Sequence, residues 1–203
     1  MQPITAIILA AGRSRRFGRD KRLEPIDNVP MLLRTAQVYH SVVPDTVVVL
    51  GPADHELAAL LAAHGITSQL CSVSSDGMGS TLSWAVRQHA QSRGWLITPA
   101  DLPFIHAETV SKLVEAGQTH FLAAPMHQGH RGHPVWFHRK YLPELSAIDG
   151  EHGAKSVLAA HRRDLHLIDV DDAGCVHDID QASDLPSLLA SRKSSGGGTR
   201  PPG

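Results

Sequence analysis

One short segment near the start of the chain combines small residues with dense positive charge. It reads LAAGRSRRFGRDK over residues 9–21 and holds five cations within nine positions. These cations are Arg13, Arg15, Arg16, Arg19 and Lys21. Gly12, Gly18 and the neighbouring alanines allow the backbone to approach a ligand closely, and this combination suits a polyphosphate. On composition alone, a flexible basic loop is the alternative.

The spacing of this segment excludes two common phosphate-binding loops. Gly12 and Gly18 are separated by five residues and Lys21 comes late, so the segment is not a Walker A loop. The GxGxxG turn that a dinucleotide-binding dehydrogenase needs is also missing from the sequence.

Carboxylates at the ends of two predicted strands are candidate metal ligands. Asp101 lies at the end of the strand-like run Trp95–Pro99. A carboxylate at that end of a strand, next to a phosphate-binding loop, is a natural Mg²⁺ ligand. Near the end of the chain, Asp178 and Asp180 alternate with an apolar residue, which puts both on one face of an extended strand. The alternatives are a cap or turn carboxylate for Asp101 and a pair of N-caps for a last helix.

Residues 75–82 lie between a predicted strand and a predicted helix. Free N–H groups at the start of a helix favour anionic ligands, so Gly77 and Thr81 are further candidate nucleotide contacts. Plain N-capping by Ser80 or Thr81 is the alternative. His127, His130 and His133 recur at every third position, but a loop containing glycine and lacking cysteine gives them no fixed geometry for zinc.

The elements that must position these residues alternate along the chain. Strands are expected over residues 4–9, 46–50, 68–71, 95–99, 121–125, 134–137 and 165–170, and helices over 30–40, 54–64, 80–92, 106–116, 153–161 and 182–190. This order predicts a single three-layer, Rossmann-like α/β domain with a mostly parallel sheet over residues 1–190. Ligands then bind beyond the carboxyl ends of the strands. Residues 191–203 lack apolar residues suited to a core, and we expect this tail to be disordered or foreign to the natural chain.

Composition narrows the class of protein. With 203 residues, 42% hydrophobic, the chain is long enough for one domain with a real core, and its net charge of −1 argues against a broad nucleic-acid or membrane surface. Aromatic residues make up 4%, too few for platforms that stack single strands. Cys71 and Cys175 are far apart in the sequence, and we expect both to be reduced thiols. No signal peptide and no apolar run of about 20 residues is apparent, so we expect a cytoplasmic protein.

The first segment resembles the LAAGxSxRxGxxK signature of the sugar-nucleotide and cofactor nucleotidyltransferases. Within them it is most similar to the molybdenum cofactor cytidylyltransferase branch. The resemblance implies a fold of the nucleotide-diphospho-sugar transferase type. It also implies that Leu9, Ala10, Ala11, Gly12 and Ser14 face the nucleotide, that Arg16 and Lys21 hold its phosphates, and that Arg16, Lys21 and Asp101 are catalytic.

Five later segments resemble motifs of the same family in the same order. Residues 77–82 are similar to GMxxSL, with Thr81 in place of serine, and residues 99–103 to PADxP, whose aspartate binds metal. Residues 131–134 match RGHP, and residues 150–155 resemble GDxGAR/K, which implies acceptor contacts from Arg131, His133 and Lys155. Residues 178–185 are similar to DIDTPEDL but depart from it at Gln181, Ala182 and Ser183. This implies Asp180, and less directly Asp178, as metal ligands beside Asp101.

The resemblance implies a reaction that depends on Mg²⁺, or on Mn²⁺. CMP passes from CTP to the phosphate of molybdenum-bearing molybdopterin, and pyrophosphate leaves. Ala11 stands where the guanylyltransferase branch tends to have a second glycine, which favours CTP. The alternatives are a guanylyltransferase of the same cofactor, a sugar-phosphate or alditol-phosphate nucleotidyltransferase, and a non-catalytic nucleotide-binding protein. A molybdoenzyme or its chaperone is a partner by family only; no nucleic acid or membrane partner is expected.

Overall fold

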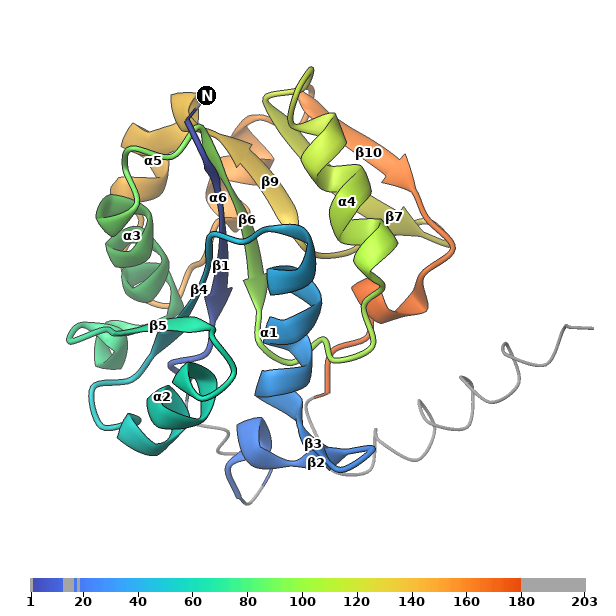
Figure 1. Cartoon of the computed structure of the whole chain (residues 1–203). Helices are drawn as coiled ribbons and strands as arrows, with labels where there is room; N and C mark the ends of the chain where they lie inside the picture. Colours follow the sequence, from blue (N-terminus) through green and yellow to red (C-terminus); the bar gives the residue numbers. More distant parts are fainter. Residues whose placement is uncertain (1, 13–16, 18, 180–203) are drawn as a thin grey trace, which may run out of the picture.

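The structure is a computed structural model that describes residues 2–12, 17 and 19–179. Its centre is a sheet of eight strands in the described part of the chain, in the order β10-β7-β9-β6-β1-β4-β5 with β8 paired to β7 (Figure 1). The strands are β1 (Ile4–Leu9), β4 (Thr46–Leu50), β5 (Thr67–Leu70), β6 (Gly94–Pro99), β7 (Leu122–His127), β8 (His130–Arg131), β9 (Val135–His138) and β10 (Leu165–Asp169).

Helices cover both faces of this sheet. They are α1 (Met31–Val42), α2 (His55–Ala62), α3 (Met78–Gln88), α4 (Ala107–Ala116), α5 (Leu142–Ser146) and α6 (Lys155–Ala160). Short 3-10 turns are η1 (Lys21–Leu23), η2 (Ser74–Asp76), η3 (Arg139–Tyr141) and η4 (Ala173–Cys175), and β2 (Pro25–Ile26) pairs with β3 (Val29–Pro30) in a small hairpin.

The alternation of side chains along β1 separates two cores. Ala6 and Ile8 pack in one core with α1, α2 and α4, whereas Ile7 packs in the other with α3, α5 and α6. Because both faces of the sheet are covered, β1 and β4 are apolar along almost their whole length, as central parallel strands require. This is the predicted three-layer α/β domain with a mostly parallel sheet.

The strand β9 is the main exception to the parallel order, because it runs antiparallel to both β6 and β7. The glycine-containing loop that carries His130 also contains β8, which folds back on β7 as a hairpin. The β2–β3 hairpin was not predicted. Its tight two-residue turn consists of Asp27 and Asn28, which both have the positive φ that such a turn requires, at 50° and 65°. The helix expected over residues 80–92 begins earlier, at Met78, and ends at Gln88.

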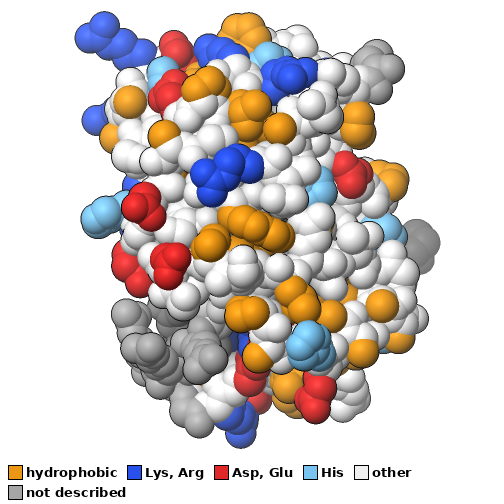
Figure 2. Space-filling model, turned by 90° about the vertical axis from the view of Figure 1, so that its left-hand side faces the viewer, with side chains coloured by type: hydrophobic (Ala, Val, Ile, Leu, Met, Phe, Trp, Pro, Cys, Tyr) orange, Lys and Arg blue, Asp and Glu red, His pale blue; other side chains and the backbone are white. Residues whose placement is uncertain are grey.

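Charged side chains are interspersed on the face of the molecule in Figure 2 rather than gathered by sign. In the described residues, none of the helices has the length and apolar character needed to cross a membrane. The last predicted helix and the tail lie outside these residues.

Gly94 begins β6 where the sheet leaves no room for a side chain. A Cβ there would lie 2.4 Å from Cη2 of the fully buried Trp136 and 2.5 Å from the carbonyl oxygen of Phe137. We expect Gly94→Ala to lower the free energy of unfolding in urea by about 1–3 kcal/mol, because the core must shift to accept the methyl group. Gly153→Ala is the control, since its Cβ would meet only the Met78 side chain, at 3.5 Å. Equal stability of the two variants would contradict this reading of the sheet.

Candidate functional site

A cavity of about 820 Å³ opens beyond the carboxyl ends of β1, β4 and β6. Its walls come from the loops that follow these strands and from the start of α3. Eight residues of the sequence prediction line it: Leu9, Ala10, Ala11, Gly12, Lys21, Gly77, Thr81 and Asp101. Ser14 and Arg16 lie outside the described residues. The cavity is where an open α/β sheet binds its ligands.

Lys21 and Asp101 meet at the floor of this cavity. Lys21 Nζ donates to Asp101 Oδ2 at 2.7 Å and to the carbonyl oxygen of Ile179 at 2.9 Å. The backbone N–H of Ile179 donates in turn to the carbonyl oxygen of Asp101 at 3.0 Å. The final described segment is therefore held beside Asp101, with Asp178 adjacent to it in the chain.

The second carboxylate oxygen, Oδ1 of Asp101, is buried and has no hydrogen-bond partner among the described residues. A buried, unsatisfied carboxylate oxygen is costly unless something binds it, and a hard divalent cation prefers such a ligand. Asp101 therefore fits a metal. In the described part of the chain, no three His, Cys, Asp or Glu side chains gather as a complete metal site, and Asp180 lies outside that part. Residues 176–179, the described part of the segment in which an extended strand was expected, form a turn and irregular chain.

The start of α3 differs from the prediction of free N–H groups. The N–H groups of Gly79 and Ser80 donate to the carbonyl oxygen of Gly150, at 2.8 and 3.3 Å. Ser80 and Thr81 do not cap the helix; Thr81 Oγ1 donates to the carbonyl oxygen of Gly77 at 3.0 Å. Glycine is needed at residue 77, because its φ is 121° and a Cβ would lie 2.4 Å from that same Gly150 oxygen. These two N–H groups are therefore already bonded within the protein.

The predicted acceptor residues do not line the cavity. Arg131 is exposed on β8, and Lys155 is exposed at the first position of α6. His133 is half-buried, and its Nδ1 has no hydrogen-bond partner among the described residues. Burial lowers the pKa of His133, so its imidazole is neutral near neutral pH. A neutral imidazole binds a phosphate through one N–H rather than through charge.

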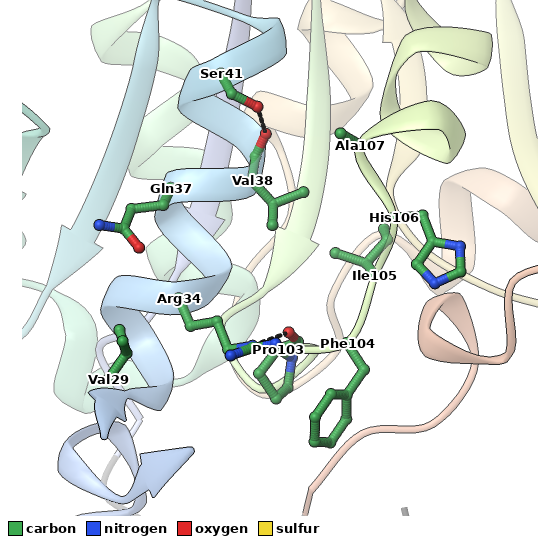
Figure 3. Close-up of a pocket in the computed structure, with 10 residues that line it drawn as sticks. All are labelled: Val29, Arg34, Gln37, Val38, Ser41, Pro103, Phe104, Ile105, His106 and Ala107. Atoms are coloured by element: carbon green, nitrogen blue, oxygen red, sulfur yellow. Dashed lines mark hydrogen bonds between the residues drawn. The ribbon is translucent and has the colours of Figure 1, made fainter. Parts of the chain in front are cut away.

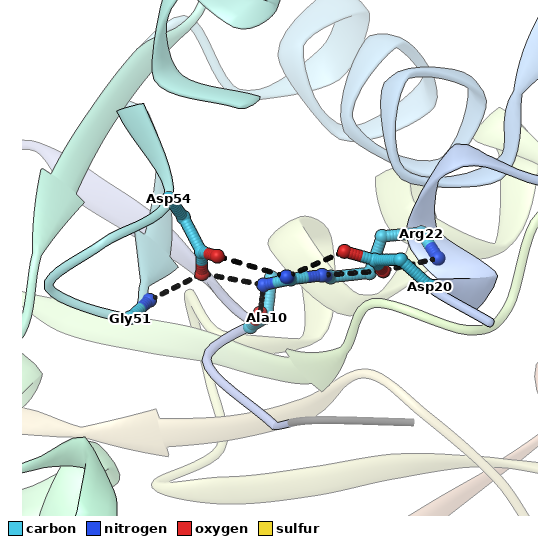
Figure 4. Close-up of polar contacts among 5 residues, drawn as sticks. All are labelled: Ala10, Asp20, Arg22, Gly51 and Asp54. Carbon is cyan, nitrogen blue, oxygen red and sulfur yellow. Dashed lines mark hydrogen bonds and ion pairs between the residues drawn. The ribbon is translucent and has the colours of Figure 1, made fainter. Parts of the chain in front are cut away.

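Sequence analysis missed Arg22, which lies at the centre of a buried network (Figure 4). Its side chain donates to both oxygens of Asp54, to both oxygens of Asp20 and to the carbonyl oxygen of Ala10, at distances of 2.5–2.9 Å. The residue is 8% exposed. Asp54 precedes α2, but its side chain makes no cap bond to this helix and instead binds Arg22 and the N–H of Gly51. The only sequence signal was an arginine directly after Lys21.

Hydrogen bonds in this network offset the cost of burying the charge of Arg22. Burial disfavours the charged form of Arg22, but its bonds to Asp20 and Asp54 outweigh this effect and raise its pKa. The bonds from Arg22 hold the pKa of Asp20 below its usual value. Arg19, one of the five predicted cations, is 65% exposed and forms a two-bond ion pair with Glu24. Arg13, Arg15 and Arg16 lie outside the described residues.

A second groove, of about 490 Å³, lies between α1 and the loop that leads into α4 (Figure 3). Arg34 crosses one end of it, where Nε donates to the carbonyl oxygen of Pro103 at 3.0 Å and Nη1 pairs with Asp27 at 3.2 Å. The predicted site residues are not part of its walls.

The lowered pKa of Asp20 makes its contribution to stability depend on pH. A carboxyl whose pKa is lower when folded stabilises the fold above its unfolded value, near 3.8, and loses that effect as the pH falls through the folded value. We therefore expect Asp20→Asn to lower the free energy of unfolding near neutral pH, with a difference from the natural sequence that shrinks below about pH 4. Glu108→Gln, in the exposed pair with Lys112, should change little at either pH. Urea unfolding measures both, and a pH-independent difference for Asp20→Asn would contradict the assignment.

The sequence of this chain is similar to the sequences of known proteins. Residues 6–165 match the family described as the MobA-like NTP transferase domain. A molybdenum cofactor guanylyltransferase of Cupriavidus metallidurans is 35% identical over 118 residues, which are 57% of this chain and 56% of the relative. The chain thus aligns with about half the length of that relative. The purine catabolism protein PucB of Bacillus subtilis is 28% identical over 192 residues, covering 87% of this chain and 91% of PucB.

Solved structures agree with this result. Rv0371c of Mycobacterium tuberculosis superposes with a TM-score of 0.80 at 26% identity, covering 93% of this chain and 98% of that one. A second structure of Rv0371c, described as a complex with manganese, has a TM-score of 0.78 at 26% identity and covers 94% and 100%. Because the family match spans most of the described chain, this protein belongs to the MobA-like NTP transferase family.

Proposed function

We propose that this protein transfers a nucleoside monophosphate from an NTP to the phosphate of a small-molecule acceptor and releases pyrophosphate. The observation that carries the proposal is the ion pair of Lys21 and Asp101 at the floor of a cavity walled by Leu9–Gly12. A cation and a carboxylate with one unsatisfied oxygen suit a triphosphate and its accompanying metal, and the small residues leave room for base and ribose.

The reaction needs positioned charge more than proton transfer. An acceptor phosphate oxygen forms a bond to the α-phosphorus as the bond to the pyrophosphate oxygen breaks. A phosphomonoester has a second pKa of about 6, so the attacking oxygen is already ionised near neutral pH and needs no general base. Lys21, with Arg16 from the same loop, offsets the charge that develops on the triphosphate. Arg131, His133 and Lys155 are the candidate contacts for the acceptor.

A divalent cation, Mg²⁺ or Mn²⁺, held by Asp101 with Asp180 and Asp178, would neutralise the phosphates when bound. The unsatisfied Oδ1 of Asp101 supports this ligand set. The manganese complex described for Rv0371c supports a divalent ion in a related fold.

CTP with molybdenum-bearing molybdopterin is the substrate pair that we favour. Ala11 lines the cavity, and its methyl group takes space that a glycine would leave for a larger base. GTP is the second candidate, supported by relatives named as guanylyltransferases of the molybdenum cofactor. The longer alignment with PucB, which carries a different name, leaves another phosphorylated acceptor as an alternative to molybdopterin.

Pyrophosphate release tests the proposed function directly. The protein is incubated with CTP, GTP, ATP or UTP and Mg²⁺, with and without molybdenum-loaded molybdopterin. We expect release with CTP that depends on the pterin. Release with GTP alone would keep the reaction and change the nucleotide. Nucleotide binding without release in any mixture would indicate either a different phosphorylated acceptor or a non-catalytic role. Failure to bind every NTP in the presence of Mg²⁺ would reject the proposal.

Lys21→Ala tests the role of the ammonium group. We expect kcat to fall about 100-fold or more, with a much smaller change in the Kd of the nucleotide, because the charge it offsets is largest in the transition state. Lys112→Ala is the matched control, since it breaks another lysine–carboxylate pair, on the surface of α4. A Lys21→Ala variant that changed only KM would contradict a role in the transition state.

A further inference from the structure

We infer that Arg22 is a positioning residue that holds the wall of the nucleotide cavity in shape and thereby sets the choice between a one-ring and a two-ring base. This inference rests on the proposed function, because it concerns the selectivity of the same site. Arg22 itself lines the cavity, and its guanidinium joins two neighbouring loops of the cavity wall.

The first of these loops, residues 9–12, follows β1, and the second, residues 51–54, follows β4. Arg22 Nη1 donates to the carbonyl oxygen of Ala10 at 2.7 Å and to Asp54 Oδ2 at 2.5 Å. Nη2 donates to Asp54 Oδ1 at 2.9 Å, so the contact with Asp54 has two bonds. Nη1 of Arg22 is therefore shared by both loops.

The carboxylate of Asp54 carries this connection into the backbone of the second loop. Its Oδ2 also accepts the N–H of Gly51 at 2.8 Å. Beyond this bond, Gly51 sits close to the first loop, since a Cβ on it would lie 3.7 Å from the carbonyl oxygen of Ala11. The spacing of the two loops at Ala11 is thus tied to the Arg22–Asp54 pair.

The other edge of the guanidinium is fixed by Asp20. Nε donates to Asp20 Oδ1 at 2.8 Å and Nη2 to Asp20 Oδ2 at 2.7 Å. Asp20 and Arg22 flank Lys21, whose ammonium reaches Asp101. Figure 4 shows the guanidinium of Arg22 between the carboxylates of Asp20 and Asp54. The same planar group therefore connects both loops to the segment that carries Lys21.

Arg22 is poorly placed to bind phosphate itself. Two carboxylates and one carbonyl take up its donors, and its side chain is 9% exposed. Its positive charge is more than matched by Asp20 and Asp54, so the network offers an incoming triphosphate no net attraction. This separates Arg22 from the phosphate-binding cations expected in the same segment.

Size selection by a pocket depends on walls that hold their spacing. A pocket that excludes a group by shape discriminates by roughly 10–200-fold, and only while it stays rigid. A planar arginine fork fixes two partners at once, whereas lysine offers a single flexible ammonium. Replacing the fork should loosen the walls and reduce discrimination between bases.

The test compares Arg22→Lys with the natural sequence by kcat/KM for CTP and for GTP, and by the Kd of each nucleotide with Mg²⁺. We expect the ratio of kcat/KM between the favoured and the disfavoured nucleotide to fall at least about threefold. Most of this change should come from the Kd values, because the disfavoured nucleotide should gain affinity relative to the favoured one. Partial unfolding of a variant does not change this ratio, because a loss of folded protein lowers the activity with CTP and with GTP by the same factor.

Arg34→Lys is the matched control. Arg34 also ties a loop carbonyl to a carboxylate, but it borders the second groove and not the nucleotide cavity. We expect its selectivity ratio to equal that of the natural sequence. Asp54→Asn is the second variant if Arg22→Lys does not fold, and we expect the same loss of selectivity.

Each result decides the inference. An unchanged ratio in folded Arg22→Lys or Asp54→Asn, with both nucleotides weakened equally, would show that the network only stabilises the fold and would overturn it. A natural protein that binds CTP and GTP equally would also overturn it. Failure of the natural protein to bind any NTP would instead reject the proposed function, and this is seen before any variant is made.

Discussion

The register of three parallel strands is the constraint on which the site depends. Leu9 of β1 pairs with Val49 of β4 and with Pro99 of β6, so these strands end at one level. The loops beyond them are therefore brought together whatever their sequences. A shift of one residue would exchange Ile7 and Ile8 between the two cores, so burial on both faces holds the register and, with it, the position of the site.

Paired charges keep the cavity in shape. Lys21 and Arg22 are neighbours in the chain, yet each bonds to its own carboxylates, Asp101 for the first and Asp20 with Asp54 for the second. The two cations have different freedom. Several bonds hold Arg22 between its two partners, whereas the half-buried Lys21 bonds to Asp101 alone of the two networks' carboxylates. In the proposed function, the arginine maintains the geometry, and the lysine moves to a phosphate when a metal takes the charge of Asp101.

Local patterns predicted most of the fold. β1 and β4 match their predicted ranges residue for residue, because continuous β-branched and apolar runs between turn residues have few other solutions. The antiparallel direction of β9 could not be predicted, because a single short strand shows the same alternation of side chains and a similar composition in either direction. The short segments β2, β3 and α5 were missed, because a few residues carry too weak a pattern.

The site was predictable where the chain itself brings residues together. The loop from Leu9 to Lys21 is one continuous segment, and Asp101 follows the strand beside it, so strand order alone predicts that they meet. The roles of Arg22 and Gly150 depend on contacts with Asp54, 32 residues away, and with Ser80, 70 residues away. No periodicity encodes such contacts. A motif supplies the chemical groups, whereas distant contacts such as that of Arg22 with Asp54 fix how the cavity wall lies around them.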